Sequence, residues 1–443
     1  MGQVFSLPFR LADTTWTYYR GMVHYLWGAG RTQPFGTTLF LKPHPSDPPA
    51  QVLFKQNARI HLFSLASNFY LYRKPHYRKP SYRADLLDNL RNVAIPGTGI
   101  PLSWFVGSQW TALGVLLGVV NPLVSLTASF HYWIKTGRSI SEEYRKRLLA
   151  PDDWFNYWRM NCNLVGMHAL LNDMPDDYEM ENKWTFLVEG KKRGVPVSPY
   201  LESPEAIVVK HRNEEGGMGI FFYKNAVHGG DWIIQERIGN SDWVSSLLPK
   251  NAPLSTFRVI TSSRRGFADE ATEQPGDIQA MTCVFRAGRA GASTDHDSIL
   301  FDVDTATGLI RGGAVNANWY RLGWSAWWSC PWRATHAYRT HPDGKGIAVS
   351  GNYVPDIQKV LETAVTAHAK LCPSVPMAGW DVVLTDHKEV PIALLETNLS
   401  CNFFMAKMDL QNYMDFCEEG FKALQEKRLA ADAAKKKFVA KVT

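Results

Sequence analysis

The charge-free stretch between Arg91 and Lys135 constrains the fold of this chain more than any other feature of its sequence. It contains no Asp, Glu, Lys or Arg, and its middle, from Trp110 to Trp133, reads WTALGVLLGVVNPLVSLTASFHYW. A helix of about 20 apolar residues can cross the hydrocarbon core of a bilayer. The tryptophans at the ends of this run resemble the aromatic anchors of a membrane interface.

Three arrangements of this segment stay open. Pro122 predicts a kink or an end of the helix within the run, whereas Gly114 and Gly118 form a close-packing pair. A single crossing would put the two flanking parts of the chain on opposite sides of the membrane. The alternatives are a peripheral contact with a membrane at about residues 104–134, a buried pair of core helices, and a true span.

Two further features are typical of contact with a membrane surface. The chain begins MGQVFS, which fits the pattern for myristoylation of Gly2. A single acyl chain binds membranes only marginally, so a second signal would be needed. Residues 72–83 alternate Tyr with Lys and Arg, a pattern that suits anionic headgroups.

Composition narrows the class of protein. The 443 residues are 45% hydrophobic and 20% charged, which predicts a globular chain with more than one structural unit. The net charge of +6 is spread along the chain, so we expect no nucleic-acid partner. Six scattered cysteines without a C-x-x-C pair favour reduced thiols, and the N-terminus lacks a secretory pattern. We therefore expect a cytoplasmic protein, with a membrane surface as an open partner.

The remaining sequence predicts an α+β organisation. Seven segments rich in β-branched and aromatic residues read as strands, with an amphipathic helix at about Pro355–Lys370 among them. The strands are expected at AIVVK, WIIQERI, TFRVITS, MTCVFR, ILFDVD, WDVVLT and PIALLETN. We divide the chain into a helical, apolar region at 1–140, an α+β domain at 141–410, and a C-terminal helix with a Lys-rich tail at 411–443.

Two segments carry residues suited to phosphate binding. Lys183 begins a predicted helix. Lys210 leaves a predicted strand and is followed by Gly216, Gly217 and Gly219, where backbone N–H groups can close on phosphate oxygens. No G-K-[ST] follows, so this is not a Walker A loop.

Two further segments carry oxygen-rich ends of apolar strands. The strand at Trp232–Ile238 contains a Gln235-Glu236 step, which can offer main-chain groups to an adenine and a carboxylate to a ribose. Asp381 precedes Glu396 by a hairpin's length, and Glu396 and Asn398 share one face of a strand. Two carboxylates and an amide oxygen suit Mg²⁺.

The order of these motifs resembles the ATP-grasp superfamily, and more closely its sugar-transfer-associated and glutamate-ligase-like members. The resemblance covers about residues 150–410. Its segments include NK…GVPVSP, VVK…GGMGI, WIIQERI, LSTFRVITS, TCVFRAGRAG, ILFDVDTATG, HPDGKG, VPDIQKVLETAVTAHAKL and AGWDVVLTD…PIALLETN.

This resemblance implies two α+β lobes that clasp ATP, a lid at about 183–240 and a metal-binding part at about 250–410. It implies that Lys183 and Lys210 contact the phosphates, under the loop of Gly216, Gly217 and Gly219, and that the adenine and ribose lie along Gln235, Glu236 and Ile238. It also implies that Mg²⁺ is held by Asp381, Glu396 and Asn398, and that the transferred phosphate and the acyl substrate are contacted by Arg258 and Arg286. Arg289 is either a further such residue or an ordinary surface charge.

The implied reaction is an ATP- and Mg²⁺-dependent ligation, in which a carboxylate becomes an acyl phosphate that an amine attacks. A kinase-like transfer to a hydroxyl acceptor and a membrane-associated ATP-binding scaffold remain alternatives. The chain departs from the relatives' pattern at Asp295-His296-Asp297 and at His341–Gly346. Both departures are expected near the acceptor, so they leave its identity open.

Overall fold

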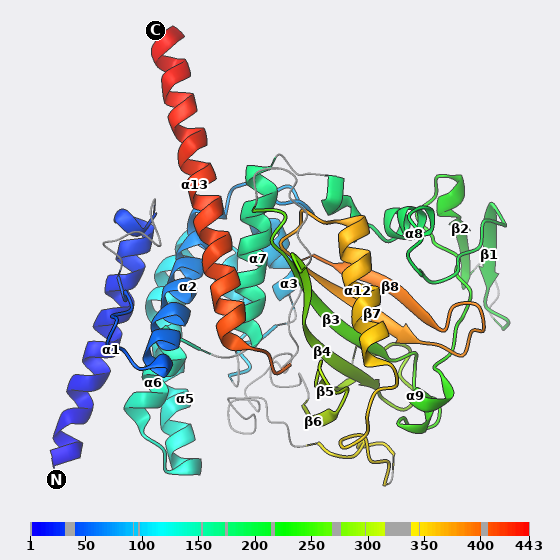
Figure 1. Cartoon of the computed structure of the whole chain (residues 1–443), viewed down its shortest axis with the longest axis horizontal. Helices are drawn as coiled ribbons and strands as arrows, with labels where there is room; N and C mark the ends of the chain where they lie inside the picture. The colour runs from blue at the N-terminus through cyan, green and yellow to red at the C-terminus, as the bar shows by residue number, and fades with distance from the viewer. Residues whose placement is uncertain are drawn as a thin grey trace.

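The computed structural model describes residues 2–31, 40–91, 93–95, 98–151, 154–172, 176–213, 218–267, 276–296, 298–314, 338–344, 346–399 and 406–442. A helical layer lies beside an α+β part built around one antiparallel sheet (Figure 1). The predicted α+β class is therefore confirmed.

The helical layer joins the two ends of the chain. Its elements are α1 (Gly2–Leu26), η1 (Ala29–Arg31), α2 (Pro49–Leu71), α3 (Tyr82–Leu90), α4 (Ser103–Val106), η2 (Thr111–Val120), α5 (Asn121–Thr136), α6 (Ile140–Leu149), α7 (Trp154–Leu171) and α13 (Leu410–Val442). Helix α13 returns to pack on α2 and α7: the Phe63 and Phe421 rings lie 5.0 Å apart, and Tyr413 Oη donates to Asn161 Oδ1 at 2.8 Å. The predicted boundary at residue 140 falls between α5 and α6, which also pack together.

The apolar run forms one helix, η2 followed by α5. Among the described residues it is the one helix long and apolar enough to cross a membrane by length and composition. The helix continues through Pro122. Before it, η2 has the wider turns of a π-helix, in which an N–H bonds the carbonyl five residues earlier, as Asn121 N–H does with Leu116 O. Only 22% of its most apolar window is buried, so the segment is not a core helix.

The sheet has six antiparallel strands in the order β6-β5-β4-β3-β7-β8. They are β3 (Thr256–Ser263), β4 (Ile278–Gly288), β5 (Ser298–Val303), β6 (Ile310–Ala314), β7 (Met377–Leu384) and β8 (Ile392–Asn398). Helix α12 (Ile357–Leu371) packs against β3, β4 and β7, and its apolar side faces them. One face of the sheet is thus covered, and the other is left for a cleft.

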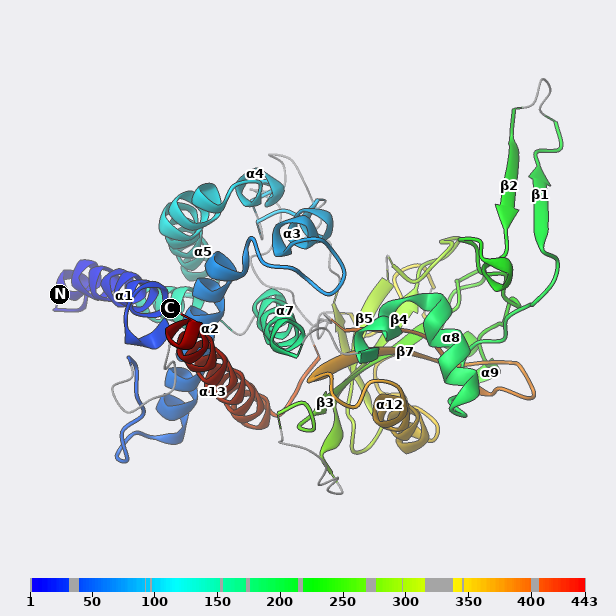
Figure 2. The same cartoon turned by 90° about the horizontal axis from the view of Figure 1, so that it is seen from above.

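A separate hairpin, β1 (Ala206–Lys210) with β2 (Ile220–Lys224), stands away from the body of the molecule (Figure 2). It follows η3 (Asp176–Glu181) and α8 (Lys183–Lys192), and it precedes η4 (Ala226–His228) and α9 (Asp242–Ser246). Val209 and Phe222 lie on opposite faces of the hairpin and are 47% and 77% exposed. A two-stranded hairpin with both faces in water is marginally stable.

Six of the seven predicted strands are present. The seventh, Trp232–Ile238, is extended but bridges other segments only at Trp232 and Gln235 within the described chain. Its partner there is the loop at Pro199–Leu201, which is too short to continue a ladder; Glu236 N–H donates to Pro199 O at 3.1 Å. Strands β2 and β6 were not foreseen.

A buried hydrogen-bond chain joins α12 to the sheet. Trp380 Nε1 donates to Thr261 Oγ1 at 2.8 Å, and Thr261 Oγ1 lies 2.7 Å from His368 Nδ1. His368 Nε2 lies 2.9 Å from Val375 O, which can only accept, so Nε2 carries a proton. Burial lowers the pKa of His368 to about 4, so the ring is neutral at pH 7.

Acidification should destabilise the protein through His368. Its folded-state pKa lies below the unfolded value, so the unfolded chain takes up the proton first as pH falls. The contribution is full above about pH 6.5 and is lost as pH falls toward 4. We expect the free energy of unfolding to fall on acidification from pH 7 to 4.5 by about 2 kcal/mol more in wild type than in His368→Gln. Urea titrations followed by circular dichroism measure this, with the exposed His228→Gln as a control that keeps the wild-type slope. Equal slopes for wild type and His368→Gln would contradict the assignment.

Candidate functional site

Strand alternation gathers the charged side chains on the uncovered face of the sheet. Arg258 on β3 is the cross-strand partner of Asp381 on β7, which in turn pairs with Glu396 on β8. Trp380, one residue before Asp381, points the other way, toward His368 of α12. The sequence thus divides each strand into one side for the core and one for the cleft.

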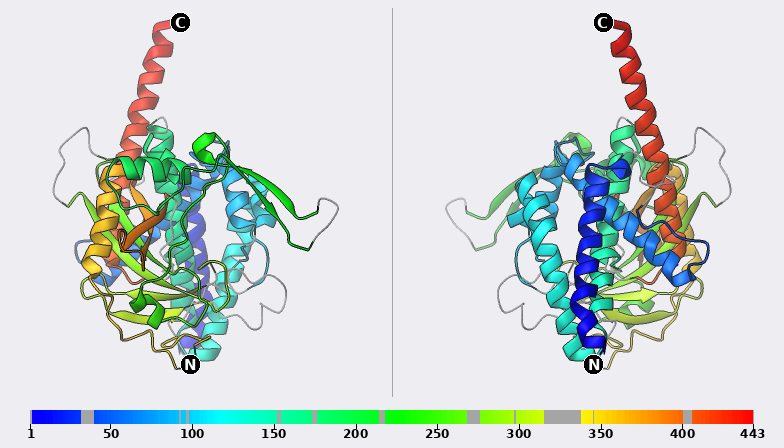
Figure 3. Two further views of the ribbon diagram at one scale, coloured as in Figure 1. Left: turned by 90° about the vertical axis from the view of Figure 1, so that its right-hand side faces the viewer. Right: turned by 90° about the vertical axis from the view of Figure 1, so that its left-hand side faces the viewer.

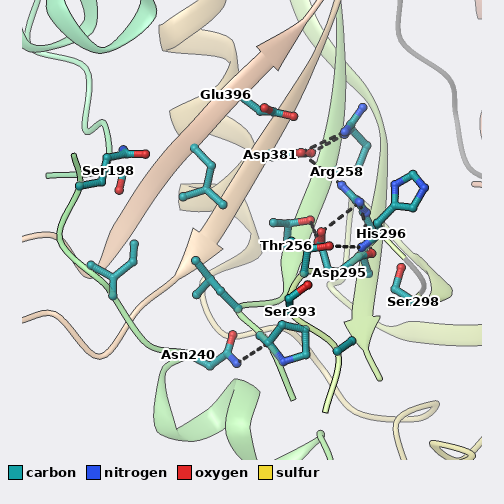
Figure 4. A pocket seen from close by; sticks show the side chains of 18 of the residues that line it. Ser198, Asn240, Thr256, Arg258, Ser293, Asp295, His296, Ser298, Asp381 and Glu396 are labelled. Atoms are coloured by element: carbon teal, nitrogen blue, oxygen red, sulfur yellow. Dashed lines mark hydrogen bonds and ion pairs between the residues drawn. The ribbon is translucent and has the colours of Figure 1, made fainter. Parts of the chain in front are cut away.

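A cavity of about 1230 Å³ lies on this face (Figure 4). It is bounded by β3, β4, β5, β7 and β8, by the start of α8, and by the segments 235–240, 251–254 and 292–296. The predicted site residues that line it are Lys183, Gln235, Glu236, Ile238, Arg258, Arg286, Asp381, Glu396 and Asn398. One hollow therefore collects residues that lie up to about 215 positions apart in the chain, from 183 to 398.

The floor of the cavity holds a buried network of opposite charges. Arg258 bonds Asp381 through both of its carboxylate oxygens, Nε to Oδ1 at 2.5 Å and Nη2 to Oδ2 at 3.0 Å. Arg286 Nη1 also reaches Asp381 Oδ2 at 3.2 Å, and its Nη2 lies 3.0 Å from Asp295 Oδ1. Asp295 accepts a further bond from Thr256 Oγ1 at 2.5 Å. Two cations and two anions, all largely buried, thus hold one another in place.

The pKa values of the two carboxyl groups respond differently to this network. Burial works to raise the pKa of Asp381, but Arg258 and Arg286 outweigh it and hold the pKa below its ordinary value. Burial dominates for Asp295, whose pKa is raised despite the attraction of Arg286. Asp381 is therefore the firmer anion of the pair, because it faces both arginines.

Glu396 and Asn398 lie beside this network at the mouth of the cleft. Asn398 Nδ2 donates to Glu396 Oε1 at 3.3 Å, so the side-chain oxygen of Asn398 points away from Glu396. Lys183 Nζ reaches Glu396 Oε2 at 2.9 Å. Lys183 begins α8, whose first N–H groups are capped by Asn182 Oδ1 at 3.0 and 3.3 Å. A lysine at a helix start thus faces a carboxylate on the edge strand.

Only two of the three predicted Mg²⁺ ligands are placed to bind a hard divalent cation in this structure. Glu396 and Asn398 offer one carboxylate and one amide oxygen on the same side of β8. Both oxygens of Asp381 are bonded to guanidinium groups, so the third member of the predicted Mg²⁺ set is engaged elsewhere. Among the described residues no group of three or more His, Cys, Asp or Glu is placed to hold a metal ion.

The segment Gln235–Ile238 forms another wall of the cavity. Gly239, directly after it, donates its N–H to Asp386 Oδ1 at 2.9 Å, and Asn240 bridges to Thr385. These contacts fix the segment to the end of β7. Glu236 is half exposed, and its carboxylate Oε1 lies 3.6 Å from His387 Nε2.

The predicted phosphate loop lies away from the cavity. Lys210 and Gly219 belong to the hairpin that stands off the body, and neither is among the described residues that line the hollow (Figure 3). Gly219 has a positive φ of 63°, which suits a glycine at this turn. Gly216 and Gly217 lie outside the described residues.

Sequence reasoning missed several residues of the cavity wall. Arg78 and Asn89 reach it from the helical layer, which the resemblance does not cover. Arg78 Nη1 lies 3.2 Å from Glu181 Oε1, which also accepts from the N–H of Leu399 at 3.2 Å. The basic–aromatic pattern at 72–83 was the only signal for Arg78, and it was assigned to lipid headgroups.

The two segments that depart from the family's pattern behave differently. Asp295 and His296 line the cavity. Asp343, in the segment His341–Gly346, bonds Arg289 twice at 2.6 and 2.7 Å, and this pair holds the pKa of Asp343 at about 2. Arg289 thus ties two loops together, and within the described chain it does not line the cavity.

Comparison with models of known protein families finds no match, and no curated protein matches the chain. The ATP-grasp resemblance therefore rests on the order of the sequence motifs alone.

Removing the Asp381 carboxylate should destabilise the fold strongly. Asp381→Asn leaves two arginines buried next to each other without their shared anion, at a cost of about 3–5 kcal/mol. Chemical denaturation measures this cost, and Glu389→Gln, at an exposed position in the β7–β8 turn, serves as the matched control. In the Asp381→Leu background, Arg258→Met should cost less than it does alone, because its partner is already gone. Additive costs would show that the two side chains do not form one network.

Proposed function

We propose that this chain is an ATP-grasp-type enzyme that uses ATP and Mg²⁺ to join a carboxylate to an amine. The observation that carries the proposal is the cleft itself. Lys183, Arg258, Arg286, Glu396 and Asn398 come from separate parts of the sequence and face one hollow on the uncovered side of an antiparallel sheet. Basic side chains that can bind phosphates thus lie in the same cleft as side-chain oxygens that can bind a divalent cation.

The nucleotide is proposed to lie between the wall at Gln235–Ile238 and the floor of the cleft. The main chain of the wall would meet the adenine, and Glu236, half exposed, would meet the ribose. Lys183 would contact the phosphates from the start of α8. Its side chain is largely exposed, so it can turn from Glu396 to a phosphate at little cost.

The network at Asp381 is proposed to exchange partners when ATP binds. Phosphate oxygens accept bidentate bonds from arginine as a carboxylate does. Arg258 and Arg286 could therefore pass from Asp381 to the transferred phosphate, and Asp381 would then join Glu396 and Asn398 in holding Mg²⁺. The bound cation would supply neutralisation of the phosphate charge.

The hairpin β1–β2 is proposed to act as a lid. Its faces carry exposed apolar side chains, including Val209 and Phe222, which would be buried when it folds onto the nucleotide. Closure would also bring Lys210 to the phosphates and exclude water from an acyl phosphate. This motion accounts for the distance of Lys210 from the cavity in the present arrangement.

The acceptor side of the cleft is assigned to Arg286 and the segment 293–296. An acyl substrate needs a cation for its carboxylate, and Arg286 is the buried arginine that lies next to this segment. Attack of the carboxylate on the γ-phosphate gives an acyl phosphate and ADP, and the amine then expels phosphate. No protein nucleophile is required. Transfer to a hydroxyl acceptor would use the same residues, which makes a kinase the second candidate.

Glu396→Ala and Asn398→Ala should each lower Mg²⁺-dependent ATP turnover at least about 100-fold, because both remove a proposed cation ligand. Release of ADP and calorimetric binding of Mg·ATP are the measurements. Glu389→Ala, an exposed acid in the preceding turn, should keep wild-type values. Wild-type turnover and binding in both cleft variants would refute the nucleotide site.

A screen of acid and amine pairs with γ-labelled ATP separates the two reactions. Ligation releases free phosphate in step with ADP only when both substrates are present. Phosphate that stays on an acceptor identifies a kinase and would overturn the ligase assignment while leaving the nucleotide site intact.

A further inference from the structure

Exposed apolar side chains follow one side of the helix formed by η2 and α5. Val115, Val119, Leu123, Phe130 and Ile134 are all exposed, and their spacings of four and seven residues place them on one face. Trp110, at the start of this helix, is 70% exposed, and Trp133 is exposed near its end. The helix thus presents an apolar stripe with an indole at each end.

Helix α1 carries a second stripe next to the first. Phe9, Trp16 and Val23 are exposed at spacings of seven residues, and Trp27, directly after the helix, is exposed four residues further on. The two helices touch where Tyr18 Oη donates to Leu117 O at 2.8 Å and Tyr19 Oη donates to Gly118 O at 2.6 Å. Figure 3 shows α1 beside this helix, and both run along the same end of the molecule. Adjacent stripes of this kind are rare on a soluble surface without a partner.

The opposite sides of these helices favour a surface contact over a crossing of the bilayer. Behind them, Thr15 Oγ1 lies 2.8 Å from Tyr144 Oη of α6, and Ser125 and Ser129 are buried. Helix α6 also carries the ion pair between Glu143 and Arg147 at 2.8 Å. A bundle that includes such a pair cannot enter hydrocarbon without a large cost. Only the outward face can meet lipid, so the helices would lie in the plane of the surface.

Basic residues surround the stripes. Residues 2–31 and 98–139 contain five Lys or Arg and a single acidic residue, Asp13. Arg10, Lys135 and Arg138 are exposed near one end of the helical layer. Arg83 Nε donates to Gly107 O at 2.9 Å, which places a further cation at the turn that joins Trp104 to Trp110 in the sequence. A cationic rim around an apolar face matches an anionic leaflet.

We propose that the outward face of α1 and η2–α5 binds the surface of an anionic lipid bilayer, with both helices lying in its plane. This arrangement leaves the nucleotide cleft on the same side of the membrane as the N-terminus. A myristoyl group on Gly2, at the first residue of α1, would add an anchor on that side. The proposal is independent of the reaction catalysed in the cleft.

Flotation with vesicles of phosphatidylcholine and phosphatidylserine at 7:3 tests this surface in the full chain. Wild type should float with these vesicles and bind pure phosphatidylcholine at least about five-fold less. Val119→Glu combined with Phe130→Glu should lower binding at least ten-fold, because both charges would enter the interface. Lys135→Glu combined with Arg138→Glu should lower binding to the anionic vesicles alone. Phe222→Glu, at a still more exposed apolar position on the hairpin, should bind as wild type does.

Three results would overturn the proposal. The first is equal binding by wild type and the two helix variants, each with an unchanged melting temperature. The second is a loss with Phe222→Glu as large as that with the helix variants, since any exposed apolar residue would then suffice. The third is a dimer in light scattering that dissociates in the Val119→Glu, Phe130→Glu variant while vesicle binding is unchanged, which would identify a second copy as the partner.

Discussion

The pairing of Arg258 with Asp381 across β3 and β7 is the contact on which the cleft depends. It lies at the centre of the sheet, and it fixes which face of each neighbouring strand is polar. Because the charges on the floor neutralise one another, the sheet can bury them at the bottom of a hollow. In the proposed function, a phosphate would replace the Asp381 carboxylate between the two arginines.

Local patterns were sufficient to predict much of the fold. The strands from Thr256 to Asn398 show β-branched runs with sharp ends, and α12 shows a clean amphipathic period, so both were found at nearly their observed bounds. The segment Trp232–Ile238 has the same composition but no partner strand within the described chain, and composition does not reveal partners. The sequence predicted a kink or an end of the helix at Pro122, and the helix does not end there but continues from the π-type turns of η2 into α5.

Some residues of the site could be predicted from local sequence patterns, and others could not. Arg258, Asp381 and Glu396 meet because strand register aligns them, and alternation within each strand was visible in the sequence. Arg78 could not be found this way, because it reaches the cleft from a helical layer about a hundred residues earlier than Glu181, its partner. That link, continued to Leu399 at the end of β8, couples the helical layer mechanically to the edge of the cleft.

The return of α13 to the N-terminal helices has a consequence for biosynthesis. Phe421 packs on Phe63, and Glu418 pairs with Arg59 at 3.0 Å, so α2 lacks these partners until residues 418–421 have left the ribosome. The α+β part can form its sheet before then, since its strands end at Asn398. Helix α2 is therefore completed only after the strands of the sheet have been made, and the apolar surface that α13 covers stays exposed in the meantime.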